Sequence, residues 1–222
     1  MNRDVLACLA EAHLTGLAQV LEVGVPGAKR ELWVRSGYLV GTRSELTEDR
    51  LGDLLAAQGR LDADLVGPIG ALAKASHLRL GELLILEELI TAADLAAALD
   101  DQARVVFVRA LSTPGAATAM EAGTTLTEHT VRFSIAETSL GAFRGGVPLE
   151  AVTEFVHAML AKSVKLRATA AQLEALRLSP AELRLVRQLG TGAGGLAATD
   201  LPARSEQDIR LLGALLALGL LA

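Results

Sequence analysis

A six-residue phrase occurs twice in this chain, and it limits what the first half can fold into. Arg50–Leu55 reads RLGDLL and Arg79–Leu84 reads RLGELL, so the two copies differ only in the acidic residue. Each copy is followed by a hydrophobic residue, a polar residue that can cap a helix, and a segment containing Asp-Leu. Each repeat of about 30 residues is therefore predicted to form a helix–turn–helix pair.

The third position of both copies is a glycine, Gly52 or Gly81. Glycine inside a helix costs about 1 kcal/mol relative to alanine, so its presence in both copies predicts helices that cross closely there. The second helix of the second repeat is predicted to be long, from Thr91 to Ala110, because its apolar residues recur every three or four positions.

Short strands are predicted on both sides of the repeats. After a helix over residues 2–14, alternating segments separated by Pro26-Gly27 and Ser36-Gly37 predict an antiparallel meander of about three strands. Two further strands are predicted at 117–122 and 130–136. Helices are then predicted over 148–162 and 163–176.

The C-terminal segment is predicted to be a separate helical unit. Ser179-Pro180-Ala181-Glu182 is a capping box, GTGAGG (190–195) is predicted to be a flexible turn, and three short helices resemble a winged-helix core. The closing LLGALLALGLLA is shorter than the roughly 20 residues of a membrane span, so a buried terminal helix is expected.

The composition supports a mainly helical protein. The chain has 222 residues, of which 51% are hydrophobic and only 3% aromatic, so its core must consist of Leu, Ala and Val. The expected fold class is α+β, mostly helical: small antiparallel strands with leucine-rich helix-pair repeats (1–176), then a winged-helix-like domain (177–222). Cys8 is the single cysteine, and the N-terminal residues do not resemble a signal peptide, so a cytoplasmic location is predicted.

Charge argues against nucleic acid as a partner. Residues 1–110 carry 11 Lys and Arg against 16 Asp and Glu, and residues 111–222 carry 10 of each. Neither half has the basic excess that binding to a phosphate backbone requires. The last predicted helix, 205–220, is mostly Leu, Ala and Gly, which suits packing better than reading a DNA groove.

No catalytic, cofactor-binding or metal-binding residues are predicted. The four histidines are scattered, the serines lack a Gly-x-Ser-x-Gly elbow, and GTGAGG lacks the Lys-Ser/Thr ending of a phosphate loop. The acidic pairs Glu48-Asp49, Glu87-Glu88 and Asp100-Asp101 are expected on solvated helix faces, because adjacent helical residues do not face each other. The polar side chains are therefore interpreted as dispersed over the surface.

Three residues around the predicted hairpin are candidates for partner binding: Trp33, Arg35 and Tyr38. Large amphipathic aromatic residues and arginine often anchor interfaces. The alternative is that Trp33 fills the core of the meander.

The order of these parts resembles the PATAN family of bacterial signalling domains. The resemblance lies in LTGLAQVLEV, KRELWVRSGYLVGTRS, the paired RLGDLL and RLGELL helices and ITAADLAAALDDQ. It implies a non-enzymatic adaptor in motility, polarity or phototaxis control, with response regulators or pilus and secretion ATPases as partners. No receiver domain lies within these residues, and Tyr38-Leu39-Val40 departs from the usual strand of the family.

Three functions stay open at this point. The first is a protein-interaction adaptor that acts without a cofactor, and that could form a homodimer. The second is a transcriptional regulator that binds DNA through the C-terminal winged helix. The third is an enzyme or small-ligand binder built on the polar residues around 116–140.

Overall fold

The computed structural model describes residues 1–113, 116–121, 131–160, 164–191 and 196–221. Its first half consists of α1 (Arg3–Thr15), β1 (Gln19–Val25), β2 (Ala28–Arg35), β3 (Tyr38–Ser44), the short turn of helix η1 (Thr47–Asp49), α2 (Leu51–Ala57), α3 (Ala63–Ala75), α4 (Leu80–Leu86) and α5 (Ala92–Ser112). The second half consists of β4 (Ala117–Glu121), β5 (Phe133–Ser134), α6 (Ile135–Gly141), η2 (Ala142–Gly146), α7 (Leu149–Met159), α8 (Ala170–Ala175), α9 (Pro180–Thr191), η3 (Ala198–Ala203) and α10 (Glu206–Ala217).

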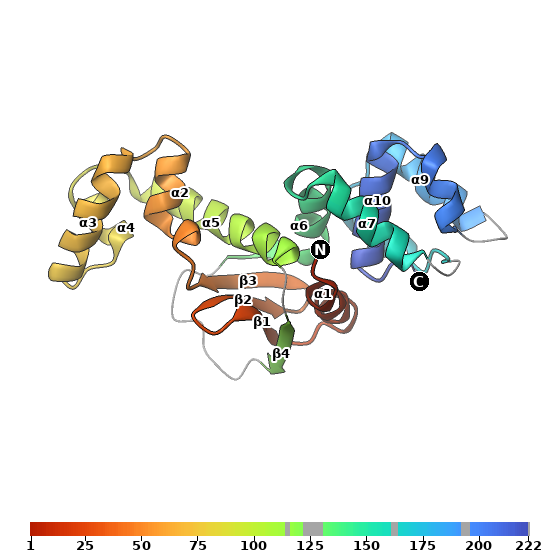
Figure 1. The fold of residues 1–222 in the computed structure, drawn as a ribbon, viewed down its shortest axis with the longest axis horizontal. Coiled ribbons are helices and arrows are strands. Elements are labelled where there is room, and N and C mark those ends of the chain that lie inside the picture. The colour runs from red at the N-terminus through yellow and green to blue at the C-terminus, as the bar shows by residue number, and fades with distance from the viewer. Residues whose placement is uncertain (114–115, 122–130, 161–163, 192–195, 222) are drawn as a thin grey trace.

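The molecule is elongated, with the sheet in the middle. Figure 1 shows α2, α3 and α4 at one end, the sheet beneath α5, and the C-terminal helices at the other end. More residues lie in helices than in strands, so the predicted α+β, mostly helical class is confirmed.

The five strands form one antiparallel sheet in the order β4-β1-β2-β3-β5. The predicted meander of three strands is present as β1, β2 and β3. The turn between β2 and β3 has positive φ at both central residues, 51° at Ser36 and 78° at Gly37. This is the backbone of a two-residue hairpin loop that matches the twist of the flanking strands.

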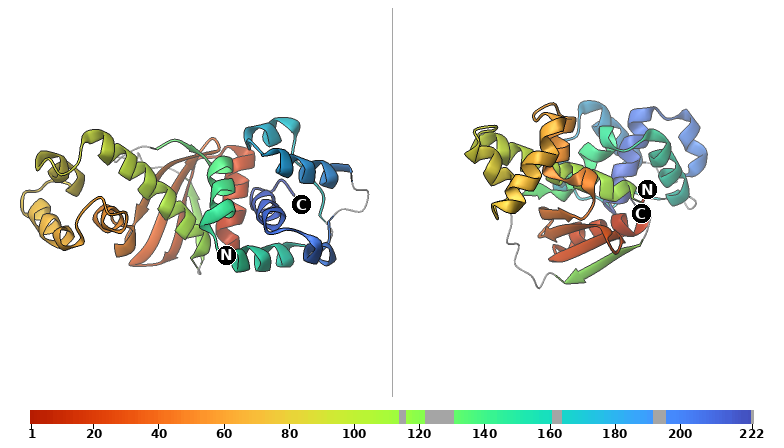
Figure 2. Two further views of the ribbon diagram at one scale, coloured as in Figure 1. Left: turned by 90° about the horizontal axis from the view of Figure 1, so that it is seen from above. Right: turned by 60° about the vertical axis from the view of Figure 1, so that its left-hand side comes forward.

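Only one face of the sheet is covered by described helices. Leu21 on β1 lies opposite Leu32 on β2, and Val34 lies opposite Leu39 on β3. These four side chains are almost fully buried. They pack under α1 and α5, which crosses the strands obliquely in the left view of Figure 2.

The apolar C-terminal segment forms a central helix, as predicted. Residues 211–218 of the α10 region are buried, and α10 packs mainly against α7 and η2. The helix therefore joins residues on both sides of the predicted boundary near 176 in one core, and the division at that position stays a prediction. None of the described helices has the length and apolar character needed to cross a lipid bilayer.

Two segments differ from their predicted secondary structure. The predicted strand 130–136, whose first residue lies outside the described residues, pairs only at Phe133 and Ser134. The Ser134 hydroxyl accepts a hydrogen bond from the Glu137 amide and starts α6 at Ile135.

The predicted helix 163–176 is helical only over Ala170–Ala175, residues 164–169 are not helical, and residue 163 lies outside the described residues. Val164 and Leu166 form bridges with Leu196 and Leu221, so their backbone is used in pairing between distant segments. A helix begins only at Ala170, after the capping box that Thr169 makes with Gln172.

Candidate interaction surface

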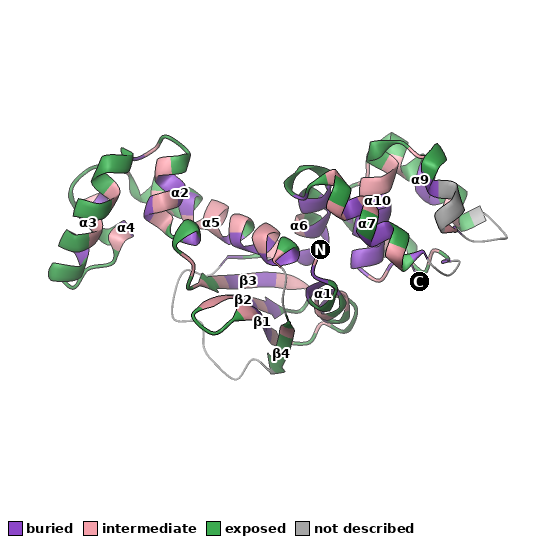
Figure 3. Cartoon of the chain, in the orientation of Figure 1, coloured by how far each residue is buried: buried purple, intermediate pink, exposed green. Residues whose placement is uncertain are grey.

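Helices α2, α3 and α4 and the start of α5 form a projection that we call the arm (residues 51–99). Its core is small and separate from the main core, and consists of Leu55, Leu61, Ile69, Ala73, Leu83, Leu84 and Ala98. Figure 3 shows that α3 is mostly exposed or half-buried. The arm therefore leaves much of its apolar surface near solvent.

Equivalent residues of the two hexapeptides make equivalent hydrogen bonds. After α2, the amides of Arg60 and Leu61 donate to the Leu55 carbonyl at 2.9 and 3.3 Å. After α4, the amides of Leu89 and Ile90 donate to the Leu84 carbonyl at the same two distances, 2.9 and 3.3 Å. The two helix ends thus turn in the same way.

Both glycines of the hexapeptides lie at tight contacts. A Cβ on Gly52 would lie 3.0 Å from Cγ1 of Val66, and a Cβ on Gly81 would lie 2.7 Å from Cδ1 of Leu95. A larger residue at either position would therefore have to displace a side chain of the neighbouring helix.

A groove of about 620 Å³ opens beside Gly81. Its apolar lining comes from Leu51, Leu80, Leu95 and Leu99, with Arg79 and Glu82 also in the wall. The volume lies within the range of about 300–1,000 Å³ that is typical of binding pockets.

The arm also exposes large apolar side chains away from the groove. These are Leu65 (41% exposed), Leu72 (47%), Leu78 (36%), Leu86 (67%) and Leu89 (43%). A single exposed leucine on a soluble protein needs no explanation, whereas a group of them on one segment is typical of an interaction surface.

Most of the net charge of the protein lies on the arm. Residues 51–99 contain three Lys and Arg and seven Asp and Glu, a net charge of −4 out of −5 for the chain. Six of these acidic residues are exposed: Asp62, Asp64, Glu82, Glu87, Glu88 and Asp94. The groove, whose own charged residues Arg79 and Glu82 balance each other, therefore lies on an acidic segment of the chain.

The three partner-binding candidates from the sequence lie elsewhere, on the sheet face opposite α5. Trp33 is half-buried between Val20 of β1 and Gly41 of β3, so it lies outside the main core. Arg35 is exposed and pairs in register with Tyr38, whose ring lies 4.6 Å from the guanidinium carbon of Arg132. The structure thus brings the three residues to one face, and their role in binding stays a prediction.

One cluster of charged side chains is buried, contrary to the expectation that polar residues are dispersed over the surface. Asp49 is 1% exposed, so the prediction of a solvated Glu48-Asp49 pair is wrong for Asp49. Its carboxylate accepts hydrogen bonds from Arg30 Nε, Arg109 Nη1 and Ser44 Oγ, all at 2.6 Å. Sequence reasoning missed this because the partners come from β2, β3 and α5.

The same contacts set the charge state of Asp49. Burial acts to raise the pKa of this carboxyl, but the hydrogen bonds from Arg30, Ser44 and Arg109 outweigh burial and hold the pKa below its ordinary value of 3.8. Asp49 therefore stays ionised at neutral pH. The cluster fixes the base of the arm to the sheet and lines none of the grooves described here.

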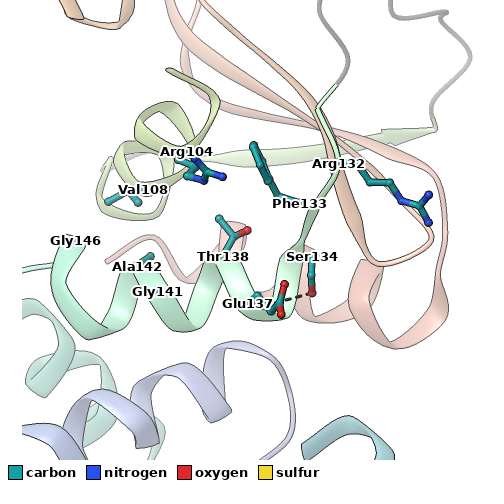
Figure 4. A pocket seen from close by; sticks show the side chains of 10 residues that line it. All are labelled: Arg104, Val108, Arg132, Phe133, Ser134, Glu137, Thr138, Gly141, Ala142 and Gly146. Atoms are coloured by element: carbon teal, nitrogen blue, oxygen red, sulfur yellow. Dashed lines mark hydrogen bonds between the residues drawn. The ribbon is translucent and has the colours of Figure 1, made fainter. Parts of the chain in front are cut away.

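A second hollow, of about 390 Å³, lies between α5, β5 and α6. Figure 4 shows Arg104 against Phe133, with the guanidinium carbon 4.2 Å from the ring centre. The hydroxyl of Ser134 caps α6, and Arg104 also pairs with Asp101. Two polar residues of the predicted strand 130–136, Arg132 and Ser134, thus make contacts that stabilise the fold.

Comparison with protein-family models, with curated proteins and with solved structures finds no match to this chain. The resemblance to the PATAN family therefore stays a prediction. Within the described part of the chain, no three His, Cys, Asp or Glu side chains gather in a way that could hold a metal ion. His129, one of the four histidines, lies outside the described residues.

Proposed function

We propose that this protein is a non-catalytic adaptor in bacterial signal transduction that binds other proteins through its arm. The observation that carries this proposal is the arm's combination of a very small core, five exposed leucines and an apolar groove. A segment that only had to be stable would bury these side chains, because each buried leucine contributes about 1.5–3 kcal/mol.

The expected partners are signalling or motility proteins of the bacterial cytoplasm. The resemblance to the PATAN family suggests response regulators or pilus and secretion ATPases, and control of motility, polarity or phototaxis. The open sheet face with Trp33, Arg35 and Tyr38 offers a second contact region for the same role.

A comparison of captured partners tests the proposal. The tagged full-length chain would be compared with a Leu86→Glu/Leu89→Glu variant, and with a control that carries Leu183→Glu on α9, where Leu183 is 37% exposed. We expect partners that the control retains and the arm variant loses. Identical sets of captured proteins for all three chains would contradict the proposal.

The alternative function is DNA-binding regulation through the C-terminal helices. The terminal helix α10 suits this poorly, because Arg210 Nη1 donates hydrogen bonds of 2.9 Å to the carbonyls of Phe143 and Val147. The observation that favours the alternative is a pair of exposed arginines on α9, Arg184 and Arg187. Salt-dependent DNA binding tighter than about 1 μM at physiological salt would favour it over the adaptor.

A further inference from the structure

We propose that the groove of the arm binds a basic amphipathic helix of a partner protein. This inference rests on the proposed function and names the chemistry of the partner. An amphipathic helix presents apolar residues at every third or fourth position, and such residues fill apolar grooves.

The apolar lining of the groove suits such a helix. Leu95 and Leu99 lie one turn apart on α5, and they line the groove together with Leu80 of α4 and Leu51 of α2. Leu95 packs over Gly81, with its Cδ1 atom 2.7 Å from where a Cβ would lie, so the leucine side chain and not the α4 backbone forms this part of the wall. Leucine or methionine anchors of an incoming helix would therefore contact the leucine side chains of α2, α4 and α5.

The charge around the groove determines which charge a partner helix must carry. Glu82 lines the groove, and Glu87 and Glu88 lie just beyond the end of α4, all three exposed. Of the three basic residues on the arm, Arg79 balances Glu82 in the groove wall, Lys74 lies in the last turn of α3, and Arg60 pairs with Asp94 at 3.7 Å. The excess of acidic residues therefore lies on the arm around the groove. Lysine or arginine on the polar face of an incoming helix would be attracted, and acidic residues repelled.

The same charge argues against a second copy of the arm as the occupant. Two arms would bring together two net charges of −4, counted over residues 51–99 of each chain. Like charges across an interface disfavour association. A partner with the opposite charge avoids this cost.

Peptide binding to the full-length chain tests the inference. Three fluorescent peptides of roughly 18 residues, or five helical turns, would be compared by anisotropy. The first is a Lys/Leu amphipathic helix, the second has Glu in place of each Lys, and the third is a scrambled Lys/Leu sequence without an apolar face. We expect the first to bind at least about tenfold more tightly than either of the others, and to weaken as salt screens the charges.

Variants of the protein test whether the Lys/Leu peptide binds at the groove. Glu87→Gln/Glu88→Gln should weaken binding of the Lys/Leu helix several-fold, and Leu99→Ala should weaken it further. The matched control Glu150→Gln/Glu154→Gln, at exposed positions of α7, should leave binding unchanged. Circular dichroism and melting curves confirm that each variant is folded.

The outcomes separate this inference from the proposed function. Equal affinity for the Lys/Leu and Glu/Leu peptides would overturn the basic-helix inference. An equal loss of affinity in Glu87→Gln/Glu88→Gln and in the control Glu150→Gln/Glu154→Gln would overturn it as well. If the arm variant still lost cellular partners, the adaptor proposal would stand without it. If light scattering showed a dimer that Leu99→Ala dissociates, a second copy would be the occupant and the inference would fail.

Discussion

Arg30 on β2 and Asp49 in η1 lie 2.6 Å apart, Nε to Oδ2, and both are buried. Arg109 on α5 reaches the other carboxylate oxygen, Oδ1, also at 2.6 Å. The carboxylate thus joins the sheet, the start of the arm and the long helix. The position of the arm on the sheet depends on this one buried anion as well as on apolar packing.

Replacement of Asp49 by alanine is expected to destabilise the protein by about 3 to 5 kcal/mol, because it leaves the buried guanidinium of Arg30 without its main partner. Urea unfolding measures the change. Arg109→Ala should destabilise the protein less than Asp49→Ala does, because the Arg109 side chain is 37% exposed and water can partly replace it around the carboxylate. Equal losses in the two variants would contradict this ranking.

Stability should fall in acid because of the same carboxyl. The pKa of Asp49 is lowered in the folded protein, so the folded state favours the ionised form. The stabilisation is complete above the ordinary pKa of 3.8 and is lost as the pH falls through the lower folded-state pKa. The free energies of unfolding of the wild type and of Asp49→Asn, measured from about pH 7 down to about pH 2.5, should become equal at the acidic end. A difference in free energy of unfolding that stays constant over this pH range would contradict the role assigned to Asp49.

Two glycines in helices should respond to alanine in opposite ways. A Cβ on Gly213 would lie 2.8 Å from Cδ1 of Phe143 and 2.9 Å from Cγ1 of Val152, so Gly213→Ala should destabilise by about 1 to 3 kcal/mol. Gly70 on α3 has no atom within 4 Å of the same position, so Gly70→Ala should stabilise by about 0.5 to 1 kcal/mol. Melting temperatures that shift in the same direction would show that the packing around Gly213 adapts.

Removal of residues 205–222 should expose the main core and cause aggregation. This truncation deletes Leu211, Leu212 and Leu215, which are at most 2% exposed. Leu215→Ala is the milder test, with an expected loss of about 2 to 5 kcal/mol. A truncated protein that stayed monomeric in light scattering, with its helical signal retained, would show that α10 is not needed for the core.

Local features were the most predictable from the sequence. Ser36-Gly37 indicated the hairpin because glycine adopts positive φ freely and serine is common in turns. Thr91, Ser179 and Ser205 indicated helix starts because their hydroxyls cap free amides. The apolar character of residues 211–221 was enough to predict a buried terminal helix. The turn and capping signals act between neighbouring residues, so they do not depend on the rest of the fold.

The contacts between distant segments were decided only by the tertiary structure. Asp49 lies 19 residues from Arg30 and 60 residues from Arg109, and nothing near it in sequence distinguishes it from the exposed Glu48. Likewise, the groove needs α2, α4 and α5 together, and the alternation in 130–136 was overridden by the capping contact at Ser134. Burial and charge pairing are sums over neighbours in space, and the chain order alone does not specify those neighbours.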